Sequence, residues 1–348
     1  MSDTKLIIGM PAGSLADPNR GGSLINLLKD AGFHAKGYEA GGPTSFPLNT
    51  FLMGWDGRPQ EFGSQLAIGE IDIAISGRDW IRERILELKY EFDQDVDVKN
   101  IMSLERGHVR IVIINADQKS RPCDEWLSAL LKENKLVTMV SEMPYLALEW
   151  FQSKAKDLGF GESHALFSVQ KFRTPPKIDS GLVIYETWGK TEAKVKNNSV
   201  DFGLEITQSG SAIGNYDLNI VDEVMESETC VFANPAIHDD PEKTEMARMF
   251  LLNLYGSIFA ENKVLVSFNC AKSNVDKMVA YLQENKLFAN EPTMNEGTNY
   301  VEFSIQLDVS AKNLTLAKVR YELAKLGATG IETIPLESSI PGLDVIDF

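Results

Sequence analysis

The fold class is indicated first by a stretch in the second half of the chain, residues 201–213 (DFGLEITQSGSAI). Residues 200–206 form an apolar run that predicts a buried strand, and a loop of small, hydroxylated residues follows it. Such loops present successive backbone N–H groups to an anion, and Ser and Thr hydroxyls add further donors. Glu205, near the end of the strand, is placed to accept hydrogen bonds from ribose hydroxyls. An ordinary strand-to-turn connection uses the same Ser and Gly residues, so this stretch alone does not decide the function.

Short apolar strands alternate with amphipathic helices along most of the chain on either side of this stretch. That order is typical of α/β proteins, in which helices cover the faces of a sheet. The predicted strands are residues 6–10, 71–76, 107–115, 181–186 and 229–235, and the predicted helices are residues 23–31, 144–157, 187–198 and 241–262. The sequence therefore predicts α/β layers up to about residue 262.

The pattern changes after Lys263 to the order β-α-β-β-α-β. Predicted strands cover residues 264–270, 300–309 and 330–336, and predicted helices cover residues 274–285 and 311–326. This order suits a small ferredoxin-like domain of about 85 residues. We expect residues 263–348 to form a separate C-terminal domain.

Composition limits the kinds of partner. The chain has 348 residues, enough for two or three domains, and 43% of them are hydrophobic, enough to bury a sizeable core. A net charge of −16 argues against nucleic acid, because phosphate backbones select Lys/Arg-rich faces. No apolar run approaches the ~18 residues of a membrane span. The scattered cysteines (Cys123, Cys230 and Cys270) and the absence of a leader pattern indicate a cytoplasmic protein with reduced thiols.

The stretch 201–213, with Glu192 ahead of it, resembles the signature of the ATP phosphoribosyltransferase family of histidine biosynthesis. Glu205 stands at the family's Asp position, and Ser209-Gly210 stand at its Ser/Thr-Gly. Further similar segments follow in the family's order: residues 71–79 (IDIAISGRD), 141–146 (SEMPYL), 231–235 (VFANP) and 327–337 (GATGIETIPLE). The resemblance thus extends over nearly the whole chain.

Three departures from the family pattern stand out. Ala12 replaces a lysine of the N-terminal segment, and Ala212 replaces a threonine whose hydroxyl lies near the 5-phosphate. Leu148 and Glu149 replace a pair of arginines. These changes leave open a divergent enzyme or a noncatalytic regulatory paralogue.

The resemblance implies a two-lobed, periplasmic-binding-protein-like catalytic core followed by a ferredoxin-like (ACT-like) regulatory domain. On that pattern residues 1–105 and 232–262 form lobe I, residues 106–231 form lobe II, and residues 263–348 form the regulatory domain. It also implies that N1 of ATP displaces pyrophosphate from phosphoribosyl pyrophosphate, with Mg²⁺ as the cofactor, histidine as the effector and a homo-hexamer as the assembly. A two-lobed small-molecule binding protein is the alternative of a different class.

The resemblance also implies roles for particular residues. Glu205 holds the ribose. Because the family's lysine is absent at Ala12, we hypothesise that Arg20, in a Gly-rich insertion, supplies that positive charge, with Arg58 and Arg78 as the other candidates. The expected substrate-binding residues are Gly13, Ser14, Gly77, Asp79, Glu142, Thr207, Ser209, Gly210, Ser211, Ala212 and Ile213.

Overall fold

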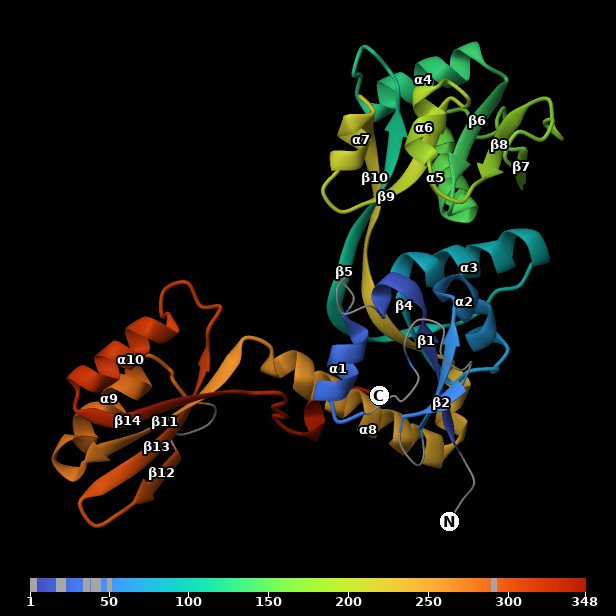
Figure 1. Ribbon diagram of the computed structural model, residues 1–348. Coiled ribbons are helices and arrows are strands. Elements are labelled where there is room, and N and C mark those ends of the chain that lie inside the picture. The colour runs from blue at the N-terminus through green and yellow to red at the C-terminus, as the bar shows by residue number, and fades with distance from the viewer. Residues whose placement is uncertain (1–4, 17–22, 34–37, 39–44, 49–51, 289–292) are drawn as a thin grey trace. The chain divides into compact units, whose positions relative to one another are not determined.

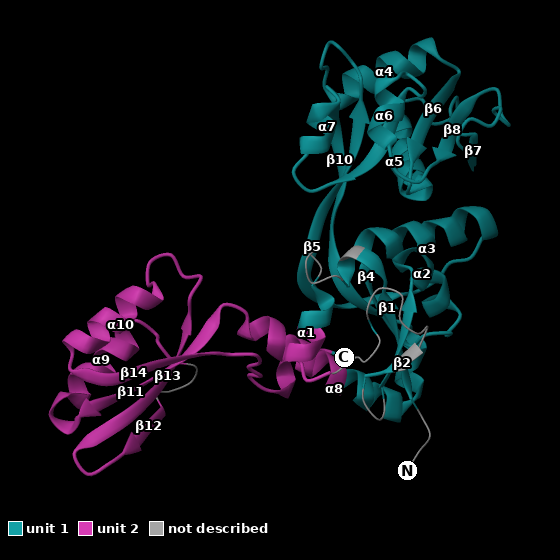
Figure 2. Cartoon of the chain, in the orientation of Figure 1, with its two compact units in different colours: residues 1–26, 34–248, 348 teal, residues 27–33, 249–347 magenta. Residues whose placement is uncertain are grey.

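The computed structural model describes residues 5–16, 23–33, 38, 45–48, 52–288 and 293–348 (Figure 1). The chain divides into two compact units, coloured separately in Figure 2. Unit 1 contains residues 1–26, 34–248 and 348, and unit 2 contains residues 27–33 and 249–347. The boundaries expected after residues 105, 231 and 262 stay predictions.

Unit 1 is built on a ten-stranded mixed sheet of order β2-β3-β1-β4-β10-β5-β9-β6-β8-β7. One lobe contains β1 (Leu6–Pro11), β2 (Ser45–Pro47), β3 (Leu52–Gly57) and β4 (Ile73–Gly77). The other contains β6 (Leu136–Ser141), β7 (Phe167–Lys171), β8 (Gly181–Glu186) and β9 (Phe202–Thr207). Strands such as β4 and β8 are buried along nearly their whole length, as expected for parallel strands covered on both faces.

Two long strands join these lobes, β5 (Lys99–Asn115) and β10 (Asn219–Ala233), as Figure 1 shows. They pair with each other antiparallel, and the register shifts at several points, including between Ser227 and Thr229. Such bulges bend a strand and increase its twist, which lets one pair of strands serve two lobes.

Helices of unit 1 cover the sheet. They are α2 (Pro59–Ala67), α3 (Arg78–Phe92), α4 (Cys123–Glu133), α5 (Pro144–Asp157), α6 (Thr191–Lys196) and α7 (Ser211–Asn215). Two further helices, α1 (Leu24–Asp30) and α8 (Pro241–Ala260), have residues in both units. Short 3-10 helices cover Gly13–Leu15 and Pro235–Asp239. In the second lobe Phe202 packs edge-on against Trp126 and Trp150, which fixes α4 and α5 on the sheet. None of the helices in the described ranges is long and apolar enough to cross a bilayer.

Unit 2 contains a four-stranded antiparallel sheet of order β12-β13-β11-β14. Its elements are β11 (Lys263–Ala271), α9 (Val275–Glu284), β12 (Thr293–Glu296), β13 (Tyr300–Asp308), α10 (Leu316–Lys325) and β14 (Ala328–Pro335), with short 3-10 helices at Lys272–Asn274 and Leu343–Val345. Phe268 and Phe303 stack with ring centroids 5.3 Å apart, in a core formed only by residues between Val264 and Ala328. This is the ferredoxin-like order, so the predicted fold class is confirmed.

The predicted starts of β10 (residue 229) and α10 (residue 311) were wrong, because these elements begin at Asn219 and at Leu316. Two further boundaries were also wrong. The strand expected over residues 107–115 begins at Lys99, because Glu105 and Gly107 adopt positive φ angles of 52° and 65° without ending the pairing. The helix expected over residues 187–198 begins only at Thr191, because Gly189 (φ 74°) and Lys190 (φ 63°) are left-handed and cannot continue a right-handed helix. Neither error moves a residue of the candidate site.

Candidate functional site

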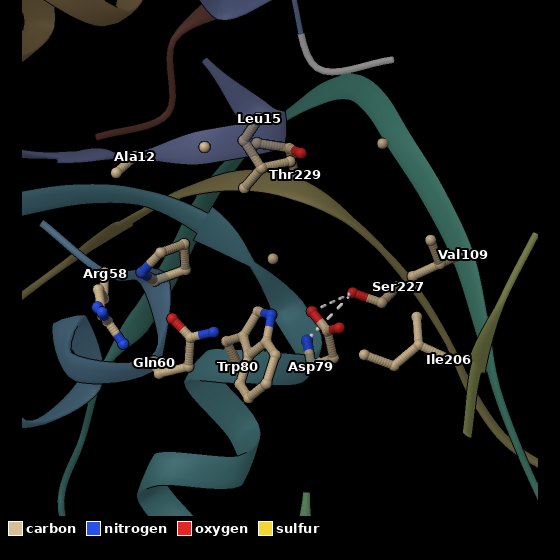
Figure 3. Close-up of a pocket in the computed structure, with 14 residues that line it drawn as sticks. Ala12, Leu15, Arg58, Gln60, Asp79, Trp80, Val109, Ile206, Ser227 and Thr229 are labelled. Carbon is tan, nitrogen blue, oxygen red and sulfur yellow. Dashed lines mark hydrogen bonds between the residues drawn. The ribbon is translucent and has the colours of Figure 1, made fainter. Parts of the chain in front are cut away.

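A cavity of about 490 Å³ lies at the carboxyl edge of the parallel strands β1, β3 and β4 (Figure 3). Ligands of open α/β sheets bind at this edge, where loops leave the strands. Ala12 and Gly13 follow β1, Arg58 follows β3, and Gly77 ends β4; all of them line the cavity. The fold thus brings together four of the expected residues: Gly13, Arg58, Gly77 and Asp79.

Asp79 forms a polar pair with Ser227 on the wall of this cavity. The Ser227 hydroxyl donates to Asp79 Oδ1 at 2.9 Å, and the Asp79 amide donates to Ser227 Oγ at 3.1 Å (Figure 3). Only 4% of Asp79 is exposed, and burial raises the pKa of its carboxyl while the Ser227 bond opposes that shift. A Cβ on Gly77 would lie 2.2 Å from Asp79 Oδ1, so only glycine permits this arrangement.

The loop after β9 is organised by its own hydroxyls. Thr207 Oγ1 accepts a bond from the Gly210 amide at 2.9 Å, and the left-handed Gly210 (φ 78°) turns the chain into α7. The Ser209 and Ser211 hydroxyls lie 2.7 Å apart and are exposed, whereas Ile213 is buried beneath them. Hydroxyls and the free amides of a first helical turn therefore face solvent together, the arrangement that binds phosphate groups.

This loop does not itself line the cavity. Ile206, the residue before Thr207, is the lining residue that comes from β9. Ala212, which was expected to bind substrate, is exposed at the start of α7.

Glu205 lies among other carboxylates. The backbone amide of Ile206 donates a hydrogen bond to Glu205 Oε1 at 2.9 Å, and the Thr191 hydroxyl lies near the same carboxyl group. Burial, then the charges of Glu192 and Glu142, raise the pKa of Glu205 to about 7. Glu205 is therefore poised to change charge close to neutral pH.

Lys194 is the neighbouring cation. Its ammonium donates to the carbonyls of Gly189 at 2.7 Å and of Lys190 at 3.3 Å. Burial lowers the pKa of Lys194, although Glu142, Glu192 and Glu205 act in the opposite direction. Glu142 also accepts a hydrogen bond from the Gly189 amide, so this turn holds the Glu142 carboxylate in place.

A second cavity of about 290 Å³ shares the lining residues Arg58, Gln60 and Trp80 with the first. It contains Glu142, and it therefore links Arg58 of one lobe to the expected residue Glu142 of the other. The two cavities form one cleft between the lobes of unit 1.

Comparison with known proteins identifies the family. The family model described as HisG, ATP phosphoribosyltransferase, matches residues 58–254, more than half of the chain. The chain belongs to the ATP phosphoribosyltransferase family. An ATP phosphoribosyltransferase of Pelodictyon phaeoclathratiforme is 28% identical over 334 residues, covering 94% of each chain. One of Geotalea daltonii is 28% identical over 349 residues, covering 98% of this chain and all of the relative.

A solved structure supports the fold. The ATP phosphoribosyl transferase (HisG:HisZ) complex from Thermotoga maritima superposes with a TM-score of 0.50 at 17% identity, covering 72% of this chain and 96% of that one. The two-lobed α/β core expected from the sequence is therefore confirmed as the fold of this solved structure.

Two of the expected site residues lie wholly or partly outside the described part of the chain. Arg20 lies outside the described residues, and the backbone of Ser14 lies in the short helix Gly13–Leu15 while its side chain is not described.

Sequence reasoning missed other residues of the cleft. Arg110 on β5 pairs with Thr207 on β9, and its guanidinium lies 4.0 Å from the position of a Cβ built on Gly210, so it is a cation beside the loop. Thr229 and Trp80 line the first cavity. Arg110 follows Val109 and precedes the apolar run 111–114, a signal that a charge there faces something other than the core.

The site offers carboxylates that could share a metal with a phosphorylated substrate. No group of three or more His, Cys, Asp or Glu side chains among the described residues could hold a metal by itself. Mg²⁺ characteristically uses one or two carboxylates together with substrate phosphates and water. Glu205 and Glu192 offer carboxylates next to the loop, so the residues present fit a metal that arrives with a phosphorylated substrate.

Proposed function

We propose that this protein transfers the phosphoribosyl group of phosphoribosyl pyrophosphate to N1 of the adenine of ATP, the first step of histidine biosynthesis. The bond from the anomeric carbon to the pyrophosphate oxygen breaks, and a bond from that carbon to N1 forms. The observation that carries the proposal is the cleft in which Gly13, Arg58 and Asp79 meet beside the Glu205 strand, in a chain of this family. Positioning and preorganised charge supply the rate, because no covalent enzyme intermediate is needed.

The loop after β9 is proposed to bind the 5-phosphate of the donor. The Ser209 and Ser211 hydroxyls, together with the amides of Ala212 and Ile213, supply the donors, and Gly210 allows the turn. Arg110, paired with Glu223 at 3.2 Å, adds a positive charge at the edge of this loop. Thr207 acts indirectly, by bonding the Gly210 amide.

Glu205 is proposed to accept hydrogen bonds from the ribose hydroxyls, with its carboxylate oriented by the Ile206 amide. Arg58 is proposed to balance the charge of the departing pyrophosphate, since it lines both parts of the cleft. Mg²⁺ would be held by pyrophosphate oxygens with Glu205 or Glu192, and it would neutralise developing negative charge. Arg20 was expected to supply the same positive charge as Arg58, and this role of Arg20 also remains a proposal.

Regulation and assembly are proposed from the family resemblance and the fold of unit 2. Histidine would bind the ferredoxin-like domain, and the active assembly would be a homo-hexamer in the cytoplasm. Inhibition of turnover by free histidine, and the molar mass in solution from light scattering, test these two proposals separately.

Purified protein incubated with ATP, phosphoribosyl pyrophosphate and Mg²⁺ tests the activity. We expect a rise in the ultraviolet absorbance of the adduct and one pyrophosphate released per adduct, both requiring ATP. Binding of both substrates without turnover would instead indicate the noncatalytic paralogue that Ala12 and Ala212 leave open. Binding of neither would favour the two-lobed receptor.

A further inference from the structure

Gln60 and Trp80 stand at the boundary between the two cavities of the cleft. Gln60 lies in the first turn of α2 and Trp80 in the first turn of α3, and both residues line the first cavity as well as the second. Both are partly exposed, so their side chains are open to a ligand. Figure 3 shows the Gln60 carboxamide and the Trp80 indole on the same wall of the first cavity.

The backbone of Gln60 is held in place, whereas its side chain is available. Its carbonyl oxygen accepts a hydrogen bond from Arg84 Nε at 3.0 Å, which ties this turn of α2 to α3. Within the described ranges, no residue forms a hydrogen bond with the Gln60 carboxamide. A carboxamide presents an acceptor oxygen and a donor nitrogen side by side. Gln60 therefore suits a ligand that offers a donor and an acceptor next to each other.

The Trp80 indole supplies a flat surface beside this amide. Leu15, Val109 and Ile206 add apolar lining to the first cavity. Aromatic side chains stack on any nucleic-acid base, because every base has a π-face. Stacking thus contributes affinity, and the choice between bases requires polar groups at the edge of the ring.

Adenine has the edge that is complementary to a carboxamide. Its N6 amino group is a donor and its N7 is an acceptor, and glutamine pairs with both in nucleic-acid complexes. A 6-oxopurine such as guanine has acceptors at both positions, so a carboxamide satisfies only one of them. N1 lies on the other side of the amino group from N7, so this pairing leaves the lone pair of N1 free to attack.

The charge of the second cavity also favours an amino group. Its lining contains more carboxyl groups than cations, namely Glu61, Glu83, Glu87, Glu142 and Glu186 against Arg58 and Arg84. When N1 forms the new bond, the ring gains a positive charge that it shares with the exocyclic amine. Carboxylates stabilise such a charge, and they repel a triphosphate or an exocyclic carbonyl oxygen. The amino side of the base therefore suits the second cavity, and the triphosphate does not.

We propose that the acceptor base stacks on Trp80 while the Gln60 carboxamide bonds its N6 and N7, so that the protein selects a 6-aminopurine nucleotide over a 6-oxopurine nucleotide. This inference rests on the proposed function and extends it, because it assigns the residues that choose the acceptor. Trp80 sets the affinity for any purine, and Gln60 sets the preference among purines.

The test measures the Kd of Mg²⁺-ATP and of Mg²⁺-GTP by calorimetric titration of the wild type and Gln60→Arg. We expect the wild type to prefer ATP by about tenfold or more. Arginine donates twice and suits O6 and N7 of guanine, so Gln60→Arg should shift the ratio of the two Kd values toward GTP by about 10–100-fold. The added charge does not affect this ratio, because both nucleotides carry the same triphosphate.

Gln65→Arg is the matched control. Gln65 lies in the same helix and is also partly exposed, but it does not line either cavity. Its substitution adds the same charge and should leave the ratio of the two Kd values unchanged.

Trp80→Leu tests the stacking surface. It should weaken the binding of both nucleotides about tenfold and leave their ratio unchanged, because stacking does not distinguish the two purines. Trp80→Phe keeps an aromatic ring and should recover most of the affinity. If Trp80→Leu has a lowered Tm, the comparison of Trp80→Phe with the wild type still reports on the ring.

Several outcomes would overturn the inference. Equal binding of ATP and GTP by the wild type, or an unchanged ratio in Gln60→Arg, would show that Gln60 does not contact the base. Turnover with both nucleotides at equal rates would support phosphoribosyl transfer and overturn the base assignment. If the wild type binds ATP selectively without turnover, the proposed reaction fails while the Kd ratio still decides the role of Gln60. If it binds neither nucleotide, both proposals fail.

Discussion

At the scale of single residues, the carboxyl group of Glu205 is the group of the site whose pKa is shifted most clearly by charged neighbours. It is surrounded by Glu192 and Glu142, with Lys194 as the neighbouring cation. Burial and like charge both favour its neutral form, and the Ile206 amide at 2.9 Å opposes them. Binding to ribose hydroxyls requires acceptor oxygens, so the ionised form is the competent one.

This predicts a pH dependence. With a pKa of about 7 in the free enzyme, the ionised fraction of Glu205 rises with pH through neutrality and levels off about one unit above. We expect kcat/KM for phosphoribosyl pyrophosphate to rise between pH 6 and pH 8 and then to level off. Glu205→Gln should lower kcat/KM by about 10²-fold and remove this rise. A variant that keeps the wild-type pH profile would show that another group titrates.

Ala212 permits a gain-of-function prediction. It is exposed at the first turn of α7, where a larger side chain meets no packing obstacle. Ala212→Thr adds the hydroxyl that the family pattern has at this position, close to the proposed 5-phosphate. We expect KM for the donor to fall about fivefold, the equivalent of about 1 kcal/mol for one hydrogen bond.

Ala212→Val is the control that distinguishes the effect of the hydroxyl from the effect of a larger side chain, because valine has the shape of threonine without the oxygen. It should leave the donor KM at or above the wild-type value. If Ala212→Thr and Ala212→Val change the donor KM equally, the 5-phosphate does not bind at this end of the loop.

At the scale of elements, the amino terminus of α5 is capped from another helix. Glu83 on α3 accepts the Tyr145 amide at 3.0 and 3.1 Å and the Leu146 amide at 2.7 Å. Arg82 on α3 pairs with Glu149 on α5 at 2.5 Å. Because α3 follows β4 and α5 follows β6, these contacts connect the two lobes of unit 1.

Glu83 should make stability depend on pH. Burial raises its pKa to about 8, well above the value near 4.5 of an exposed glutamate, so the folded protein holds this proton more tightly than the unfolded chain. Its stabilising contribution is full below about pH 4.5 and is lost as pH rises through about 8. We expect the Tm of the wild type to fall between pH 6 and pH 9 more steeply than that of Glu83→Gln.

Glu149→Gln provides the comparison, since it removes an exposed carboxylate of the same helix contact and should retain the wild-type slope. If the two variants shift the pH profile of Tm equally, surface charge and not the buried carboxyl determines the slope.

These elements also show what the sequence could predict. Strand β9 and its loop follow from local signals, an apolar run and then Ser and Gly, and both were found. The Glu83 cap was not predicted, because it joins residues 62 positions apart and depends on how two helices pack. Thr229 was placed in a predicted strand, but the bulged pairing of β5 and β10 that brings it to the first cavity was not predicted. Local patterns thus predict elements, whereas the wall of the cleft depends on long-range pairing.

At the scale of the whole molecule, the small sheet of unit 2 has a hydrophobic core of its own, separate from the core clusters of unit 1. The core of unit 2 consists of residues between Val264 and Ala328, and it is complete without unit 1. Alternate residues of β13 are buried and exposed, so one face of the sheet packs on α9 and α10. A domain with its own core can fold by itself.

The fragment of residues 262–348 should therefore fold alone. It keeps all four strands of the small sheet, the bond from the Val309 amide to the Asn262 carbonyl at 2.7 Å and that from the Leu336 amide to the Lys263 carbonyl at 3.2 Å. We expect a cooperative urea transition by circular dichroism and dispersed amide resonances. Phe303→Ala should cost about 3–5 kcal/mol, because it empties the stacked position against Phe268, and this loss is enough to unfold a domain of this size. Tyr300→Ala, at a half-exposed position of the same strand, should leave the transition nearly unchanged. A fragment that remains unfolded while the full chain is stable would show that the small sheet depends on the rest of the chain for its fold, residues 27–33 and 249–261 of unit 2 included.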